Sequence, residues 1–221
     1  MCQLLSLRGV TVFCRGLYKL SMSIIEPYSS IQVLSYDDHG WLHPTNARNL
    51  QNLIETYDPE VIVELGAWLG ATTCHLAKVS SSSAVVYAVD HFLGGPDIAH
   101  IPEVAQRLPN LYQQFLSNVR HMSLCHKIVP VRMEVMEAAR ALNIEPNLVY
   151  MDACMFESSF YPEAVAWWER LASGGILCGD DWICFPEVPR VLIRLSDELG
   201  LTVHHDENFW WCDPKPEAQN V

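Results

Sequence analysis

Short apolar segments alternate with amphipathic helical segments along most of this 221-residue chain, and this alternation constrains the fold more than any other feature. Buried strands that alternate with helices form a parallel sheet with helices on both faces. We therefore predict an α/β fold with a doubly wound, mostly parallel, seven-stranded sheet. The predicted strands are residues 61–65, 84–89, 128–132, 148–151 and 175–178, with an extended piece in 201–211. The predicted helices are residues 45–57, 71–79, 111–120, 136–142, 162–171 and 188–199.

The length and the apolar content predict one main domain. Half of the residues are hydrophobic, which is enough to bury one sizeable core. We assign residues 44–213 to this domain. Residues 1–43 are expected to be an N-terminal segment that folds over the ligand pocket as a lid, and residues 214–221 a C-terminal tail. Residues 1–25 contain three basic residues and no acidic one, a composition that targeting peptides share.

Charge and cysteine content narrow the class of partner. The formal net charge is -12, and the basic residues are scattered, so a phosphate backbone would be repelled and nucleic acid is not expected as a partner. The eight cysteines form no C-x-x-C pair, which favours reduced thiols in a cytoplasmic protein. The apolar stretches near the N-terminus are too short to span a bilayer, so no membrane is expected. A small-molecule partner is expected, and homo-oligomerisation stays open.

The predicted strand 61–65 leads into a glycine turn. Glu64 lies near the end of the strand, Gly66 follows it, and Gly70 enters the next helix. A dinucleotide fingerprint would need a bare glycine where Trp68 stands, which disfavours NAD and FAD. S-adenosylmethionine has an adenosine and an amino acid but no phosphate, so it tolerates side chains here, and Glu64 can accept hydrogen bonds from its ammonium group. The alternative is an ordinary turn in which Glu64 caps the next helix.

The next predicted strand ends at Asp90. This residue follows Gly66 at a spacing near that at which an acidic residue binds ribose hydroxyls, which favours a nucleoside ligand. Capping of a following helix is the alternative for Asp90. His91 comes next, and we keep it as a candidate general base or as a packing residue. Trp68 and Trp182 lie near strand ends, where either ring could stack on adenine or on an apolar acceptor.

Three carboxylates follow the predicted strands 148–151 and 175–178. Asp152 ends the first, and Asp180 and Asp181 end the second. Neighbouring carboxylates repel one another unless a cation compensates, and Mg²⁺ ligated by oxygen atoms would do so. Such an ion would lower the pKa of a substrate hydroxyl and aim it at a methyl group, which is the chemistry of O-methyl transfer. The alternative is that Asp180 and Asp181 cap a loop or helix, while Asp152 contacts only the cofactor.

From residue 40 to 211 the chain resembles the class I S-adenosylmethionine-dependent methyltransferases, in particular the cephalosporin hydroxylase-like and macrocin-type O-methyltransferases. The resemblance is carried by Gly40-Trp41, the octapeptide ending at Gly70, the octapeptide ending at Gly95, Phe115 to Val119, and the nonapeptide ending at Trp182. It implies that Glu64, Gly66 and Gly70 line the methionine end of the cofactor, Asp90 the ribose, and Arg132, Met133 and Glu134 the adenine. We add Ala67, Trp68 and His91 to the predicted cofactor-binding residues. The resemblance also implies that Asp152 contacts the cofactor and is catalytic, and that Asp152, Asp180 and Asp181 correspond to the metal-binding acids of the metal-dependent members.

One departure from the family pattern concerns the general base. Family members often have a histidine three residues after the acid that ends the fourth strand, and here that position is Met155. Proton removal would then fall to His91, to Glu157 or to the metal. The rival hypothesis is a cofactor-binding module without turnover, either a degenerate methyltransferase or a partner protein of a biosynthetic complex. Asp152 and His91 remain our predicted catalytic residues for S-adenosylmethionine-dependent transfer to a small-molecule hydroxyl, with Mg²⁺ as an additional cofactor.

Overall fold

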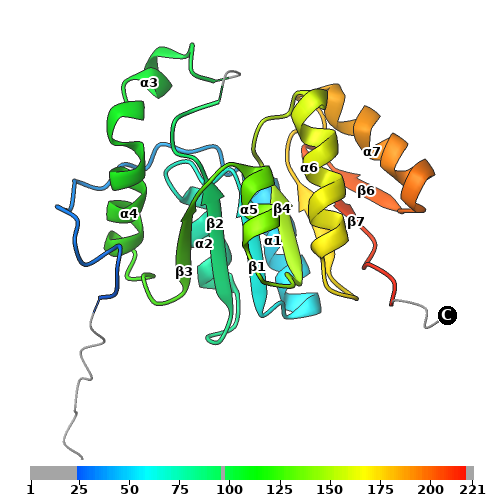
Figure 1. Ribbon diagram of the computed structural model, residues 1–221, viewed down its shortest axis with the longest axis horizontal. Coiled ribbons are helices and arrows are strands. Elements are labelled where there is room, and N and C mark those ends of the chain that lie inside the picture. The colour runs from blue at the N-terminus through cyan, green and yellow to red at the C-terminus, as the bar shows by residue number, and fades with distance from the viewer. Residues whose placement is uncertain (1–23, 96–97, 218–221) are drawn as a thin grey trace, which may run out of the picture.

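Seven strands form one sheet, in the order β3-β2-β1-β4-β5-β7-β6, at the centre of the computed structural model (Figure 1). The structure describes residues 24–95 and 98–217. The strands are β1 (Val61–Leu65), β2 (Val85–Asp90), β3 (Ile128–Arg132), β4 (Leu148–Met151), β5 (Ile176–Gly179), β6 (Val203–Asp206) and β7 (Phe209–Cys212). β1 to β5 pair in parallel, whereas β7 is antiparallel to both of its neighbours. The predicted doubly wound, mostly parallel, seven-stranded sheet is therefore confirmed.

Helices cover both faces of the sheet (Figure 1). One face carries α1 (Pro44–Tyr57), α2 (Ala71–Val79) and α4 (Leu111–His121), and the other carries α5 (Val135–Ala141), α6 (Glu157–Arg170) and α7 (Glu187–Leu199). The short helix α3 (Pro102–Ala105) and the 3-10 turn η1 (Leu108–Asn110) precede α4. Among residues 24–95 and 98–217, we find no helix with both the length and the apolar character needed to cross a membrane.

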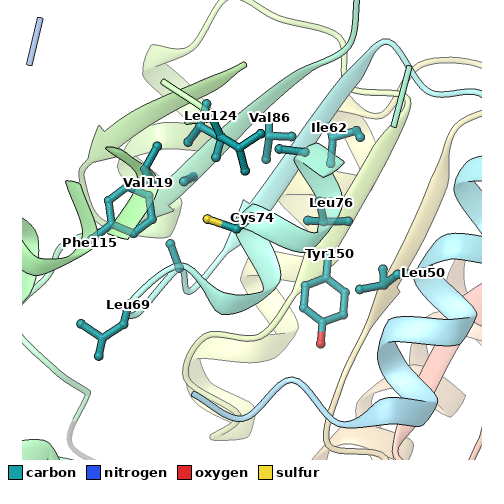
Figure 2. Packing of buried hydrophobic residues seen from close by; sticks show 14 of the residues in the cluster. Leu50, Ile62, Leu69, Cys74, Leu76, Val86, Phe115, Val119, Leu124 and Tyr150 are labelled. Atoms are coloured by element: carbon teal, nitrogen blue, oxygen red, sulfur yellow. The ribbon is translucent and has the colours of Figure 1, made fainter. Parts of the chain in front are cut away.

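The strands supply two separate apolar layers because alternate side chains point to opposite faces. Ile62 packs with Leu50 of α1 and Leu76 of α2, and Figure 2 shows this layer extending to Phe115 of α4. Val63 faces the other layer, which α5, α6 and α7 cover. β1, β4 and β5 have no exposed side chain, as expected for the central strands of a parallel sheet that is covered on both faces.

Two predicted elements differ from the structure. The helix predicted over 162–171 begins at Glu157, so Pro162 lies inside α6. The prediction places Pro162 in the first turn, where a helix loses no hydrogen bond to the missing N–H of proline. The extended piece predicted in 201–211 is a hairpin of two strands, and Glu207 adopts the left-handed conformation at its turn with φ of 52°.

The predicted lid lies partly outside the described residues, which begin at Ile24, and so do the basic residues of the predicted targeting peptide and the end of the tail. The described part includes an irregular strap, residues 32–43, that runs along α4. The side-chain amide of Asn118 accepts from the Asp37 N–H at 3.1 Å and donates to the Asp37 carbonyl at 2.7 Å. Arg107 donates to the Asp37 carboxylate at 2.8 Å. These contacts attach the strap to the helical layer.

Candidate functional site

The winding direction of the sheet reverses between β1 and β4, which are adjacent although β2 and β3 separate them in sequence. Open α/β sheets bind their ligands at such a reversal, beyond the carboxyl ends of the strands. The predicted site residues all follow strand ends, so the topology brings them to one edge of the sheet. The ends of β3, β2, β1 and β4 lie in that order, which would suit an elongated ligand lying across them.

The loop between β1 and α2 has three residues in the left-handed region. Gly66 has φ of 93°, Trp68 has φ of 47° and Gly70 has φ of 86°. A Cβ atom at Gly66 would lie 2.1 Å from the carbonyl oxygen of Asp152, so no larger residue fits between the ends of β1 and β4. Gly70 is the N-cap of α2 and lies against the ring of Phe115.

Glu64 is buried beneath this loop. The hydroxyl of Thr73, in the first turn of α2, donates a hydrogen bond to its carboxylate. Burial raises the pKa of Glu64 to about 8, and the nearby Asp90 carboxylate contributes to this increase. The contact with Thr73 is the helix-capping alternative of the sequence analysis. A carboxylate can accept about four hydrogen bonds, so this contact leaves a cofactor role for Glu64 as a prediction.

Asp90 holds two loops together at the end of β2. Its Oδ2 accepts from the Trp68 N–H at 2.9 Å, and its Oδ1 accepts from the Phe92 N–H at 2.6 Å. Burial raises the pKa of Asp90 although both backbone bonds oppose the increase. His91 lies beside it, with 3.8 Å between His91 Nδ1 and Asp90 Oδ1. Because His91 Nδ1 accepts from the Leu93 N–H at 2.9 Å, the neutral ring carries its proton on Nε2, and its basic lone pair on Nδ1 is already engaged.

The predicted adenine segment lies at the turn after β3. The Met133 N–H donates to the Val131 carbonyl at 3.0 Å, and Glu134 is the exposed N-cap residue of α5. Since β2 separates β3 from β1 in the sheet, Met133 and Glu134 lie on the far side of Asp90 from the glycine loop. This order matches a nucleoside whose ribose contacts the middle strand.

Asp152 lies at the end of β4, where its N–H donates to the Leu65 carbonyl at 2.8 Å. Burial raises its pKa well above the ordinary range, and the carboxylates of Asp180, Asp181 and Glu64 add to the increase. A hydrogen bond from Tyr150 opposes it. A carboxyl group so placed is a stronger base than an ordinary aspartate once it is ionised.

Sequence reasoning missed two buried polar residues next to Asp152. Asn46, in the first turn of α1, donates from Nδ2 to the Tyr150 hydroxyl at 3.4 Å, and neither side chain is exposed. Asn46 Oδ1 has no hydrogen-bond partner among the described residues. In the sequence, Tyr150 could have been noticed because its hydroxyl is the one polar side-chain atom in the otherwise apolar strand β4. Asn46 had no such signal, because its partners are more than a hundred residues away.

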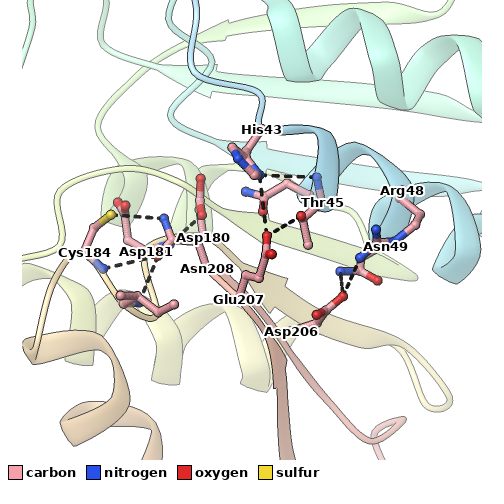
Figure 3. Close-up of polar contacts among 12 residues, drawn as sticks. His43, Thr45, Arg48, Asn49, Asp180, Asp181, Cys184, Asp206, Glu207 and Asn208 are labelled. Atoms are coloured by element: carbon pink, nitrogen blue, oxygen red, sulfur yellow. Dashed lines mark hydrogen bonds and ion pairs between the residues drawn. The ribbon is translucent and has the colours of Figure 1, made fainter.

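The Asp180 carboxylate, just after β5, is held by neighbouring amides, and Figure 3 shows it beside Asp181 and Asn208. Asp180 Oδ1 accepts from the Asp181 N–H at 2.7 Å, and Asn46 and Asn208 also donate to the buried Asp180 side chain. In the part of the chain that the structure describes, no group of three or more His, Cys, Asp or Glu side chains is placed to hold a metal ion. The predicted set of Asp152, Asp180 and Asp181 is therefore not formed. β4 and β5 are adjacent as predicted, but backbone and amide donors bind Asp180 instead.

Comparisons with known proteins agree with this architecture. Residues 63–182 match the family described as a methyltransferase domain, and this span includes all of the predicted cofactor and metal residues. No curated protein matches the chain.

Solved structures share the fold at low sequence identity. The O-methyltransferase TomG from Streptomyces achromogenes, involved in tomaymycin synthesis and solved with S-adenosylmethionine, is 10% identical, with 79% of this chain and 82% of that chain covered and a TM-score of 0.59. An O-methyltransferase from Bacillus cereus, solved with S-adenosylhomocysteine, is 14% identical, with 84% and 86% covered and a TM-score of 0.55. An S-adenosylmethionine-dependent O-methyltransferase from Thermotoga maritima is 13% identical, with 83% and 69% covered and a TM-score of 0.60.

These identities establish similarity of fold alone, whereas the family match rests on the sequence itself. The matched span covers more than half of the 221 residues and contains the reversal point of the sheet. The chain belongs to the methyltransferase domain family.

Proposed function

We propose that this chain transfers the methyl group of S-adenosylmethionine to a hydroxyl of a small molecule. The observation that carries the proposal is the set of carboxyl groups of Glu64, Asp90 and Asp152, which end three adjacent strands beside the glycine loop. Their mutual repulsion and their burial favour a ligand with positive charge. S-adenosylmethionine has an ammonium and a sulfonium group, and no phosphate that these carboxylates would repel.

The residues at the strand ends fit the parts of this cofactor in order. The glycine loop (66–70) and Glu64 would hold the methionine end, through backbone groups of the loop and the buried carboxylate. Asp90 would accept the ribose hydroxyls with the lone pairs that Trp68 and Phe92 leave unused. Met133 and Glu134 would hold the adenine, by apolar contact and by accepting from its amino group. When bound, the cofactor supplies an electrophilic methyl group.

Asp152 would accept the proton of the acceptor hydroxyl. A cation beside Glu64, Asp90 and Asp152 lowers the pKa values that burial has raised, so the Asp152 carboxylate would be ionised when the cofactor is bound. Tyr150 donates to it and Asn46 donates to Tyr150, which fixes its orientation. His91 is the second candidate base, and it would have to release the Leu93 N–H from Nδ1 to take up a proton. We assign no step to Mg²⁺, because Asp152, Asp180 and Asp181 are not arranged as its ligands.

A binding module without turnover is the second candidate function. The observation that favours it is Met155, which stands where related sequences have histidine and which packs in the core with 1% of its surface exposed. No imidazole can act from that position.

The partners and the cellular setting follow the same proposal. The net charge of -12 supports a small-molecule acceptor rather than nucleic acid. We propose a cytoplasmic protein without a membrane partner, and we leave homo-oligomerisation open. Residues 44–213 would form the catalytic domain, the segment before it a cover for the site, and residues 214–221 a tail.

Calorimetry with S-adenosylhomocysteine tests the cofactor site. We expect binding by the native chain and at least about tenfold weaker binding by Asp90→Asn, because a hydrogen bond to a charged group contributes about 1.5 to 3 kcal/mol. Asp213→Asn, which alters an exposed carboxylate bonded to His204, is the matched control and should bind normally. No binding by the native chain would refute both candidate functions. Binding without any formation of S-adenosylhomocysteine from S-adenosylmethionine across a panel of hydroxyl compounds would favour the module.

A further inference from the structure

Three aromatic rings from two distant segments form a cluster beside the glycine loop. His39 and Trp41 come from the strap (32–43), and Trp68 comes from the loop between β1 and α2. The ring centroids of Trp41 and Trp68 are 5.4 Å apart. The rings of His39 and Trp41 are in edge-to-face contact, with their centroids 4.9 Å apart. We call these three residues the aromatic wall.

The wall is held in place by hydrogen bonds on both sides. The Trp68 indole N–H donates to His39 Nδ1 at 3.2 Å, which ties the loop to the strap. Next to it, the His39 N–H donates to the Asp37 carboxylate at 3.0 Å, and Asp37 is bound by Arg107 and Asn118. The rings are therefore preorganised, and a ligand that binds them would lose little entropy by ordering them.

The wall adjoins the proposed cofactor site. The backbone N–H of Trp68 donates to Asp90, the proposed ribose ligand, and Trp41 is close to the start of α1, whose Asn46 contacts Tyr150 beside Asp152. Trp41 remains 50% exposed, although the rings of His39 and Trp68 pack against it. A large aromatic surface is thus left in water beside the glycine loop.

Other exposed apolar side chains follow strands at the same edge. Leu93 comes after β2, Phe156 after β4 and Ile183 after β5, with 65%, 43% and 68% of their surfaces exposed. An isolated exposed apolar residue is ordinary, but four on the segments at the edge where the parallel strands end favour an apolar ligand. The carboxylates at the same edge disfavour an anionic one.

We infer that the methyl acceptor carries a neutral planar aromatic ring, which stacks on the exposed face of Trp41 in the aromatic wall. The inference rests on the proposed function, because it identifies the acceptor class of the same site. Offset or tilted stacking on a fixed indole supplies binding that a saturated ring of the same size cannot supply. Methyl transfer would replace the O–H bond of the acceptor by an O–CH₃ bond, break the S–CH₃ bond and leave the proton on the protein base.

The test compares two neutral alcohols of matched shape, 2-naphthol and decahydro-2-naphthol. Calorimetric titrations of the native chain are made with and without saturating S-adenosylhomocysteine. We expect 2-naphthol to bind about 3- to 10-fold more tightly than the saturated alcohol, the range that one aromatic pair contributes. Equal affinity for the two alcohols, or no binding of 2-naphthol, would overturn the inference.

Two substitutions at Trp41 separate aromatic stacking from general apolar contact. Trp41→Phe should retain most of the preference for 2-naphthol, whereas Trp41→Leu should lose it. Both changes are at a half-exposed position, so both variants should fold. Tyr57→Ala, at an exposed aromatic residue at the other end of α1, is the control and should bind like the native chain. A preference that survives in Trp41→Leu, or that Tyr57→Ala reduces equally, would contradict the inference.

The titrations also distinguish this inference from the proposed function. If Trp41→Leu weakens S-adenosylhomocysteine binding by the same factor as 2-naphthol binding, the wall holds the cofactor and the inference fails. If S-adenosylhomocysteine does not bind the native chain, the proposed function fails, and the cofactor-free titrations still decide whether the wall prefers an aromatic ring.

Discussion

At the scale of single residues, Glu64 illustrates how the site keeps carboxyl groups out of water. Thr73 is its hydrogen-bond donor, yet burial dominates and raises its pKa to about 8 from an ordinary value of 4.5. The folded chain therefore holds a proton that the unfolded chain releases between these two values. Because the Glu64 carboxyl binds more protons in the folded state in this range, its contribution to the free energy of unfolding falls as the pH rises from about 5 to about 8.

Replacement of Glu64 by Gln should weaken this pH dependence. The neutral amide fills the same volume and does not titrate, so the decrease in the free energy of unfolding between about pH 5 and about pH 8.5 should shrink by a few kcal/mol, an order-of-magnitude figure from the size of the pKa shift. Urea denaturation at the two pH values measures the free energy of unfolding, and hence its decrease. Glu60→Gln, at an exposed position before β1, should behave like the native chain; an unchanged dependence in Glu64→Gln would show that its carboxyl is not the group concerned.

At the scale of loops and helices, the turn after β1 depends on Gly66. Gly66→Ala would place a methyl group against the Asp152 carbonyl at a position with φ of 93°. We expect a loss of several kcal/mol, together with weaker S-adenosylhomocysteine binding, because the end of β1 must move away from β4. Thermal unfolding and calorimetry measure the two effects.

Gly174 provides a matched control for this prediction. It also has a positive φ, of 74°, but a Cβ atom there would meet no atom within 4 Å. Gly174→Ala should therefore cost only about 1 kcal/mol, from the left-handed conformation, and leave cofactor binding unchanged. Equal losses of stability in the two variants would mean that the left-handed conformation, and not the close approach to β4, explains the need for glycine at position 66.

The end of α2 depends on Lys127, which lies just before β3. Its ammonium group donates to the Ala77, Ser80 and Ser81 carbonyls, at 2.5, 3.1 and 2.8 Å, in a position with 6% of the residue exposed. Lys127→Met should lower the free energy of unfolding by about 2 to 3 kcal/mol, since the last carbonyls of the helix lose a charged donor. Lys78→Met, at an exposed position in the same turn, should cost little, and a comparable loss there would refute the explanation.

Elements with a strong apolar pattern were predicted correctly, and those without one were missed. β1, β3 and β4 have the predicted limits, because short apolar runs between turn residues have few other interpretations. The short elements α3 and η1 have four and three residues, about one helical turn each, which is too short for a periodic apolar pattern to repeat. Pro162 misled the prediction of α6, because α6 tolerates a proline in its second turn.

At the scale of the whole molecule, the location of the site was predictable but its contacts were not. Parallel strands end at one edge, so any acid that follows such a strand can be assigned to that edge from the sequence. The contacts between Asp37 and Arg107 and between Asn46 and Tyr150 join residues that are 70 and 104 positions apart. No local pattern marks such pairs, and the amides that bind Asp180 arise in the same way. This is why the sequence predicted a metal site where the structure has hydrogen bonds.

The hydrogen-bonded state of Asp180 leads to a prediction for the whole enzyme. A divalent ion at a three-carboxylate site would make both stability and turnover sensitive to chelators, whereas an Asp180 carboxylate held by Asn46, Asn208 and the Asp181 N–H needs no ion. We expect excess EDTA to leave the melting temperature and S-adenosylhomocysteine binding of the native chain unchanged, and Mg²⁺ added after EDTA to change neither. Asp180→Asn keeps the size of the side chain and should respond in the same way. A loss of turnover with EDTA that Mg²⁺ restores in the native chain, but not in Asp180→Asn, would contradict this prediction and return Asp180 to the role of metal ligand.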